Sequence, residues 1–228
     1  MTFGEKVIAY HEQLEFKGLL PDKITMMNPY KESTLISDIA KAFYFKYYND
    51  QQPRNLILGI NPGRLGAGST GIPFTDTKRL SEFCNMEIDD IKTHEPSSVF
   101  VYHLIHAYGG VQAFYQDYYI NSVCPLGFTI TNEAGKEINY NYYDRKDLQQ
   151  AVLPFIVENI NKLIAMGCRR EKAFCLGTGK NFKFLNQLNQ EFHFFGEIVP
   201  LEHPRYIMQY KAKQIDFYLE DFVRKLTL

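Results

Sequence analysis

The alternation of apolar runs with amphipathic segments predicts strands separated by helices. Asn55 to Ile60 is a short, nearly continuous apolar run that Asn61-Pro62-Gly63 ends abruptly, as expected of a strand buried in a parallel sheet. Lys172 to Leu176 is a second run of this kind, and Phe194 to Pro200 is a third. Because the strands of a parallel sheet run in one direction, their carboxyl ends should meet at one edge.

Apolar residues at helical spacing fill the segments between these runs. Gln112 to Ile120 fits either a helix or a strand, whereas Phe128 to Tyr143 alternates around Gly135 as in a β-hairpin. The pattern predicts a three-layer α/β/α sandwich with a central, mainly parallel sheet, and residues 1–228 as a single domain with the helices of residues 1–50 packed on it. We expect a loop at Ile91 to Ser98. The expected helices run from Phe3 to near Gly18, from about Lys31 to Tyr48, from Thr75 onward, from Val99 to Tyr108, from Leu148 to Gly167, from about Asn181 to Gln190 and from Ile215 to Leu226.

Composition limits the possible partners. The 228 residues are 45% hydrophobic, and 25 Lys and Arg against 26 Asp and Glu give a net charge of -1, which excludes wholesale electrostatic binding of nucleic acid. No apolar run approaches the length of a membrane span, so we expect a soluble, cytoplasmic protein without a membrane partner. We also expect a monomer. The cysteines form no C-x-x-C pair and should be reduced core thiols that hold neither a metal nor an iron–sulfur cluster; they are Cys84, Cys124, Cys168 and Cys175.

Polar motifs follow each of the three predicted strands. Asn61 comes directly after the first, Gly177-Thr178-Gly179 after the second, and Glu202-His203-Pro204-Arg205 after the third. Ligands of open α/β sheets bind at this edge. The loop after Asn61 is rich in glycine, which lets backbone N–H groups approach a ligand; its glycines are Gly63, Gly66, Gly68 and Gly71.

Two alternative chemistries have weak support. Gly66 to Gly71 matches the dinucleotide-binding pattern G-x-G-x-x-G, but the strand ends six residues earlier and Pro73 stands where the helix should begin. His103 and His106 are spaced as one helix face requires for a metal site, but no third ligand is evident nearby. We therefore expect no metal and no cofactor.

A third possibility rests on a family resemblance. The segment from Gly59 to Phe74, Gly-Ile-Asn-Pro-Gly-x-Leu-Gly-x-x-x-Thr-Gly-Ile-Pro-Phe, resembles the first motif of uracil-DNA glycosylases, specifically of their single-strand-selective monofunctional branch. Ser122 to Leu126 partly matches that branch's Asn-x-Cys-Pro-Leu segment, and Ala134-Gly135-Lys136 matches its hairpin tip. His203-Pro204-Arg205 approximates its last motif, so the resemblance extends from about Arg54 to Gln214.

The resemblance implies roles for individual residues. Asn61 would position a water below the sugar, and His203 would donate a hydrogen bond to the uracil oxygen where negative charge develops, helped by amides of the glycine loop. Phe74 would stack on the extruded base, Ile60 would line its pocket, and Gly63 would leave room beside C5 for 5-substituted uracils.

The chain departs from the family at two motifs. The family's base-reading Asn corresponds to Ser122, with Asn121 one place upstream; either a bulge returns Asn121 to the pocket or Ser122 reads the base with a shorter reach. The last motif lacks a Ser-Pro between its His-Pro and its Arg. The DNA-binding segment would begin there, with apolar residues that could open the duplex and basic residues for phosphates; it comprises Arg205, Tyr206, Ile207, Met208 and Lys211, and Arg64 would extend it. The same segment fits equally well the basic start of a helix that places Ile207 and Met208 in the core.

These features favour a cofactor-independent, monofunctional DNA glycosylase that removes uracil or a 5-modified uracil in base excision repair and leaves an abasic site. We expect no lyase activity, because the first motif offers no lysine for a Schiff base. The rival hypothesis is a non-catalytic nucleic-acid or nucleotide-binding module of the same fold, which the altered motifs at Ser122 and His203 would suit. The preference between single- and double-stranded DNA stays open.

Overall fold

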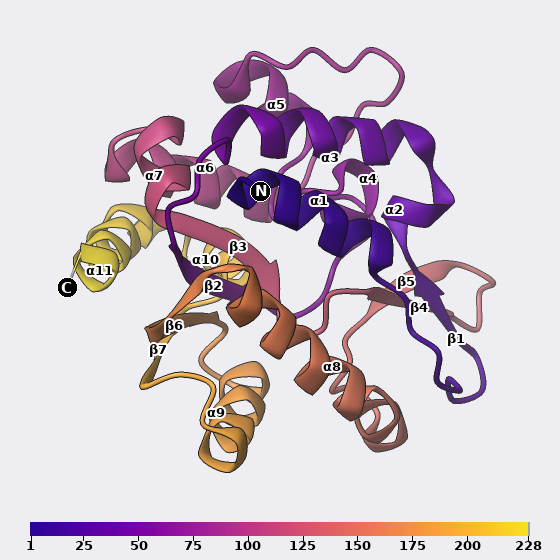
Figure 1. Ribbon diagram of the computed structural model, residues 1–228. Helices are drawn as coiled ribbons and strands as arrows, with labels where there is room; N and C mark the ends of the chain where they lie inside the picture. Colours follow the sequence, from indigo (N-terminus) through magenta and orange to yellow (C-terminus); the bar gives the residue numbers. More distant parts are fainter. Residues whose placement is uncertain (228) are drawn as a thin grey trace.

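A four-stranded parallel sheet forms the centre of the molecule. The computed structural model describes residues 1–227. In Figure 1 this sheet lies in the middle, and a second, antiparallel sheet stands to its right. The parallel sheet has the order β3-β2-β6-β7, with β2 (Arg54–Gly59), β3 (Tyr118–Ser122), β6 (Cys168–Leu176) and β7 (Glu197–Leu201). The antiparallel sheet has the order β1-β4-β5, with β1 (Ile24–Met27), β4 (Gly127–Thr131) and β5 (Glu137–Tyr140).

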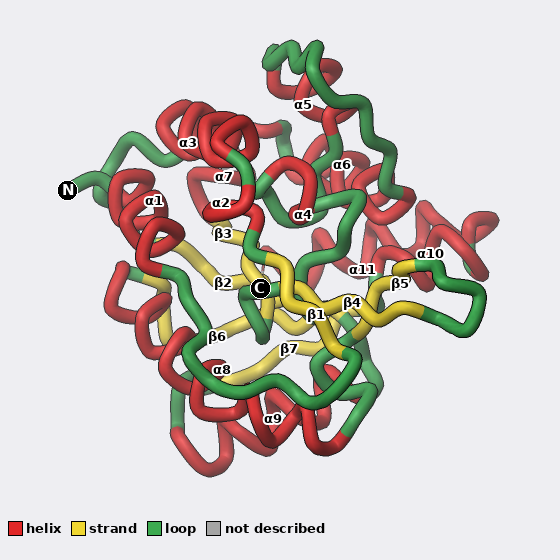
Figure 2. Tube along the Cα trace, turned by 90° about the vertical axis from the view of Figure 1, so that its right-hand side faces the viewer, coloured by secondary structure: helices red, strands yellow, loops and turns green. Residues whose placement is uncertain are grey.

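Helices cover both faces of the parallel sheet. Figure 2 shows α1 and α8 on one side of it and α6, α10 and α11 on the other. This arrangement confirms the predicted α/β class with a parallel sheet between helical layers. The helices are α1 (Phe3–Gln13), α2 (Pro29–Glu32), α3 (Thr34–Tyr47), α4 (Ala67–Thr70), α5 (Thr77–Cys84), α6 (Pro96–Tyr108), α7 (Val111–Asp117), α8 (Lys146–Met166), α9 (Lys180–Phe192), α10 (Pro204–Tyr210), the 3₁₀ turn η1 (Ala212–Gln214) and α11 (Ile215–Thr227). None of the helices in the described residues is both long and apolar enough to cross a bilayer.

Local signals set most helix ends. Thr2 and Glu5 form a capping box at the start of α1, and the Asp76 side chain accepts the Arg79 N–H at the start of α5. Gly167 ends α8 with a positive φ. Such signals are local in sequence, which is why most of the predicted helices are confirmed to within a few residues.

The first helix, expected to end near Gly18, ends at Gln13, and α6 begins at Pro96, inside the loop expected at Ile91 to Ser98. The structure corrects the prediction in three further segments. The helix expected from Lys31 to Tyr48 is divided at Ser33, whose hydroxyl caps the start of α3. The ambiguous segment from Gln112 to Ile120 contains both alternatives, the end of α7 followed by β3. Ile24 to Met27 forms β1, which the sequence did not predict because four residues carry too little periodicity and the strand is defined by its pairing with distant β4.

A buried arginine ties the start of β2 to its surroundings. The Arg54 side chain is fully buried; its Nε donates to the Tyr115 carbonyl at 2.8 Å and its Nη2 lies 2.6 Å from Asp50 Oδ2. The guanidinium also lies 5.3 Å from the centroid of the Phe3 ring and 5.4 Å from that of Tyr48. It therefore connects β2 with α1, α3 and α7.

Arg54→Ala is expected to lower the free energy of unfolding by about 3 kcal/mol, because it removes a buried charged partner together with its hydrogen bonds and ring contacts. Urea unfolding followed by circular dichroism measures the change. Lys162→Ala is the control, since its ion pair with Glu158 lies on the surface of α8 and should contribute less than about 1 kcal/mol. Equal losses in the two variants would contradict this assignment.

Candidate active site

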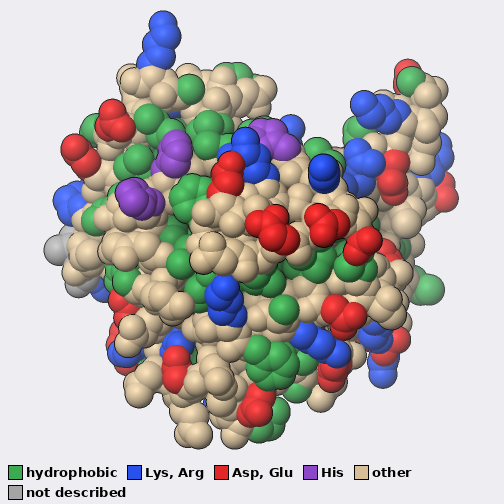
Figure 3. Space-filling model, turned by 90° about the horizontal axis from the view of Figure 1, so that it is seen from above, with side chains coloured by type: hydrophobic (Ala, Val, Ile, Leu, Met, Phe, Trp, Pro, Cys, Tyr) green, Lys and Arg blue, Asp and Glu red, His purple; other side chains and the backbone are tan. Residues whose placement is uncertain are grey.

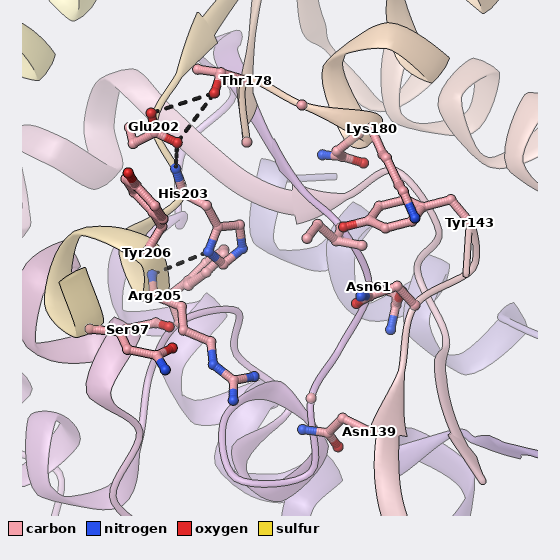
Figure 4. A pocket seen from close by; sticks show the side chains of 18 of the residues that line it. Asn61, Ser97, Asn139, Tyr143, Thr178, Lys180, Glu202, His203, Arg205 and Tyr206 are labelled. Carbon is pink, nitrogen blue, oxygen red and sulfur yellow. Dashed lines mark hydrogen bonds between the residues drawn. The ribbon is translucent and has the colours of Figure 1, made fainter. Parts of the chain in front are cut away.

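A cavity of about 510 Å³ opens at the carboxyl ends of the parallel strands (Figure 4). The loops after β2, β6 and β7 all reach it, as expected for this edge of an α/β sheet. The second sheet and the start of α6 complete its walls. The polar residues that line it include Asn61, Glu95, Ser97, Asn139, Asn141, Thr178, Lys180, Asn181, Glu202, His203 and Arg205.

The carboxamide of Asn61 is held in one orientation by the segment after β5. Its Nδ2 donates to the Tyr140 carbonyl at 3.1 Å, and its Oδ1 accepts the Tyr142 N–H at 3.0 Å. These partners lie about 80 residues away in the sequence, as the separations of 79 and 81 show. An amide oxygen has two lone pairs, so Oδ1 can accept a second hydrogen bond from a water in the cavity.

His203 presents a neutral imidazole with its proton on a defined nitrogen. It is the N-cap of α10, and its Nδ1 accepts the Arg205 N–H at 3.1 Å. Nδ1 therefore carries no hydrogen, and Nε2–H is the donor. Burial, and secondarily the charge of Arg205, lowers the pKa of His203 to about 4. The ring is thus uncharged at neutral pH and still able to donate one hydrogen bond.

Titration of His203 is expected to leave the rate of base release, the reaction that the family resemblance implies, constant from about pH 8 to about pH 5. The reason is that the pKa of His203 is lowered from 6.5 to about 4. Below that range protonation of Nδ1 breaks the bond from Arg205, and the rate should fall. Single-turnover rates measured across this range test it. Glu95→Gln is the suitable background, since burial raises the pKa of that cavity-lining carboxyl to about 7. A midpoint near 6.5 assigned to His203 would contradict the buried imidazole.

Phe74 forms an aromatic wall beside the imidazole. Its ring centroid lies 5.9 Å from that of His203, at an interplanar angle of 58°. A Cβ atom at Gly59 would lie 3.0 Å from the Phe74 ring, so glycine at the end of β2 lets the ring pack against the strand. The φ of Phe74 is +53°, which is uncommon for a residue other than glycine and is maintained by the surrounding packing.

The glycine loop does not offer the free amides that the sequence suggested. The N–H groups of Gly66 and Gly68 both donate to the Gly63 carbonyl, and that of Gly71 donates to Ala67. These glycines serve close packing instead: a Cβ at Gly68 would lie 2.8 Å from the Gly63 oxygen, and one at Gly66 would lie 2.3 Å from the Glu95 carboxylate. The expectation that these three amides stabilise a developing charge is wrong, because the loop uses them to form its own turn and α4.

Asn121 lies on the face of β3 that is turned away from the cavity. Its Nδ2 donates to the Tyr119 hydroxyl at 2.9 Å, and its Oδ1 accepts the Ser122 N–H at 2.7 Å. Ser122 pairs with Gly59, whose Cβ direction points at Phe74, so the serine side chain faces Phe74. Neither residue is among those that line the cavity. Of the two alternatives, the bulge that would return Asn121 to the pocket does not occur, since β3 pairs with β2 in unbroken register.

The predicted DNA-binding residues divide into two groups. Arg205 and Tyr206 line the cavity mouth, and Tyr206 is 40% exposed. The side chain of Ile207 is fully buried and Met208 packs on the core, because α10 begins directly after His203 and its period turns these two inward. Of the two alternatives for this segment, the core placement is confirmed and the insertion into DNA is wrong. Lys211 follows the last turn of α10, partly buried and outside the cavity.

Arg64 is also outside the cavity lining, because it turns toward the β4–β5 hairpin. Its Nη1 lies 3.6 Å from Glu137 Oε2. Figure 3 shows the face seen from above in Figure 1, where acidic and basic side chains of the described residues are intermingled rather than separated. The described residues of this face therefore form no broad basic surface of the kind that binds DNA through charge alone.

Several cavity residues were missed by the sequence analysis. Asn139 and Asn141 come from β5 and the turn after it, which were read only as a hairpin. Glu95 precedes α6, and its Oε2 is enclosed without a hydrogen-bond partner among the described residues. Lys180 begins α9, with its Nζ 5.7 Å from the centroid of the Tyr143 ring. The lysine could have been found from its position after the second strand, whereas nothing local marks the other three.

The cysteine thiols are inert core groups. All four cysteines are buried and unpaired among residues 1–227. Burial raises the pKa of Cys124, Cys168 and Cys175 to about 12. No cluster of three or more His, Cys, Asp or Glu side chains suited to a metal ion occurs in the described part of the chain.

A group the size of one nucleobase fits this cavity, where a fixed amide can hold a water and an uncharged imidazole can donate to a leaving group. A positioned water and a donor to the leaving group are what hydrolysis of an N-glycosidic bond can use, so the fold and the cavity fit an N-glycosylase. The chain belongs to the uracil DNA glycosylase superfamily, whose sequence model matches residues 45–227. It is accordingly a DNA glycosylase, and DNA is its substrate.

The structural comparison extends over the whole chain. The crystal structure of wild-type SMUG2 from Pedobacter heparinus superposes with a TM-score of 0.97 at 53% sequence identity, covering 100% of this chain and 97% of that one. No curated protein matches this chain. The likeness to SMUG2 confirms the branch to which the segment from Gly59 to Phe74 pointed, and it includes the N-terminal fifty residues that the motifs left unexplained.

Proposed function

We propose that the enzyme removes uracil, or a uracil substituted at C5, from DNA by hydrolysis and leaves an abasic site. The observation that carries this proposal is the placement of Asn61 and His203 on the same cavity, each fixed by a backbone hydrogen bond. Asn61 can hold the attacking water, and His203 can stabilise the departing base. The extruded nucleotide would enter from the mouth beside Arg205 and Tyr206.

The leaving group is stabilised mainly by His203. As the glycosidic bond stretches, negative charge gathers on the pyrimidine ring and its O2 oxygen. A hydrogen bond from neutral Nε2–H strengthens as this charge grows, and the partly buried site makes it stronger than it would be in water. Asn61 is not a base of useful strength, so its contribution is to place a water through Oδ1 on the sugar carbon that develops positive charge.

The reaction stops at the abasic site in this proposal. Lys180 is the lysine that lines the cavity, and its ammonium lies over the Tyr143 ring. That cation–π contact engages the amine with an aromatic ring, and no Schiff base is assigned to it. We assign Lys180 instead to a phosphate of the bound strand, together with Arg205.

The test is incubation with an oligonucleotide that carries one uracil, followed by treatment with or without alkali. Strand cleavage only after alkali supports a monofunctional glycosylase, and cleavage without alkali would reveal a lyase. An intact strand under both conditions, on single- and double-stranded substrates, would refute the proposed function.

A further inference from the structure

Asn139 presents an uncommitted hydrogen-bond donor beside Gly63. Its Oδ1 accepts the Arg64 N–H at 3.1 Å, which fixes the orientation of the carboxamide. Its Nδ2 lies 3.3 Å from the position that a Cβ atom at Gly63 would take. No acceptor for this Nδ2 is found in the described residues. The space that glycine leaves at position 63 is thus bounded by an amide N–H₂ group.

Two other asparagines on this cavity, Asn61 and Asn181, have hydrogen bonds at both the nitrogen and the oxygen of their carboxamides. Asn61 uses both ends of its amide on the backbone of Tyr140 and Tyr142. Asn181 donates to the carbonyls of Gly59 and Leu176, and its Oδ1 accepts the Tyr142 hydroxyl. Asn139 therefore differs from both in having its oxygen anchored and its nitrogen available.

The orientation of the base follows from the proposed function, on which this inference rests. If O2 of the pyrimidine accepts a hydrogen bond from His203, the C5–C6 edge lies on the far side of the ring. Figure 4 shows His203 on one side of the cavity and Asn61 and Asn139 on the other, on different elements. The C5 edge then faces the wall formed by Gly63 and Asn139.

We propose that Asn139 is the specificity-determining residue for the 5-position of the extruded pyrimidine. Its N–H₂ group stays hydrated beside a hydrogen atom at C5, donates to a substituent with an acceptor oxygen such as a 5-formyl group, and disfavours the methyl group of thymine. A methyl group placed there would displace water from the amide and give no hydrogen bond in return. The space beside C5 therefore discriminates between substituents by their hydrogen bonding as well as by their size.

Asn139→Asp is the sharpest variant for the test. The aspartate keeps the volume and the oxygen that accepts from Arg64, and it replaces the donor with an acceptor. Its rate on 5-formyluracil relative to its rate on uracil, in the same oligonucleotide, should fall by about 10-fold against wild type, the effect of losing about one hydrogen bond. The ratio cancels the effect of the added charge on DNA binding.

Asn141→Asp is the matched control, since it adds the same charge to the same wall two residues further along. Its ratio should stay at the wild-type value. Asn139→Ala, at an exposed position of β5, should instead raise the rate on thymine relative to uracil, because it removes the amide without adding a charge. Thermal melting establishes that all three variants are folded.

Unchanged ratios in Asn139→Asp and Asn139→Ala, with active wild-type enzyme, would overturn the role of Asn139 and leave the proposed function standing. A wild-type enzyme that releases neither uracil nor 5-formyluracil would overturn both.

Discussion

His203→Ala is expected to lower the single-turnover rate of uracil release by about 100-fold, in the range measured when one electrostatic donor is removed from an active site. The donor is Nε2–H, whose position is set by the bond between Nδ1 and the Arg205 N–H. Alanine cannot donate to O2 of the leaving base, and nothing else among the glycine-loop amides of Gly66, Gly68 and Gly71 is free to replace it. The effect should fall on the chemical step rather than on DNA affinity.

Rapid-quench kinetics with excess enzyme measure this rate, and fluorescence anisotropy with a non-cleavable substrate analogue measures binding. His193→Ala is the control, because that histidine is exposed at the end of α9 and lies outside the cavity. An unchanged rate in His203→Ala would assign leaving-group stabilisation to another residue.

Asn61→Ala is expected to lower the same rate by a similar factor, about 100-fold, since the attacking water would lose its acceptor and its position. The variant also leaves the Tyr142 N–H and the Tyr140 carbonyl without their partner. Part of the loss can therefore come from movement of the segment after β5, which carries Asn141 into the cavity wall.

A melting curve and a binding measurement separate the two causes. If the water is what matters, DNA affinity and melting temperature change little while the rate falls. Asn161→Ala provides the comparison, because that asparagine bonds only to its own helix at Val157. A rate that falls only in proportion to lost folded protein would mean that Asn61 supports the wall and does not act on the water.

The position of the site could be predicted because it depends on local features. Buried apolar runs identified β2, β6 and β7, and Asn61 and His203 follow two of them directly. In a parallel sheet these ends must converge, so two distant residues could be assigned to one site before any contact was known. The structure places both on the same cavity.

The direction of individual side chains could not be predicted in the same way. The choice between Asn121 and Ser122 depends on the register of β3 against β2, which places Ser122 beside Gly59 and turns Asn121 toward Tyr119. The glycine-loop amides looked available because the sequence does not reveal which carbonyl each N–H will meet. Ile207 fitted either DNA or the core, because its helix could not be oriented without the core on which it packs.

The sequence by itself determined the α/β class, the edge of the sheet that carries the site, and the segment from Asn61 to Phe74 as its centre. Spacing and periodicity within one segment were sufficient for these, because they follow from the conformation of a strand or helix alone. Only the tertiary structure brought Asn139 to Arg64, 75 residues apart, and Tyr142 to Asn61. Such contacts depend on how a hairpin docks against a distant loop, and no local pattern encodes that docking.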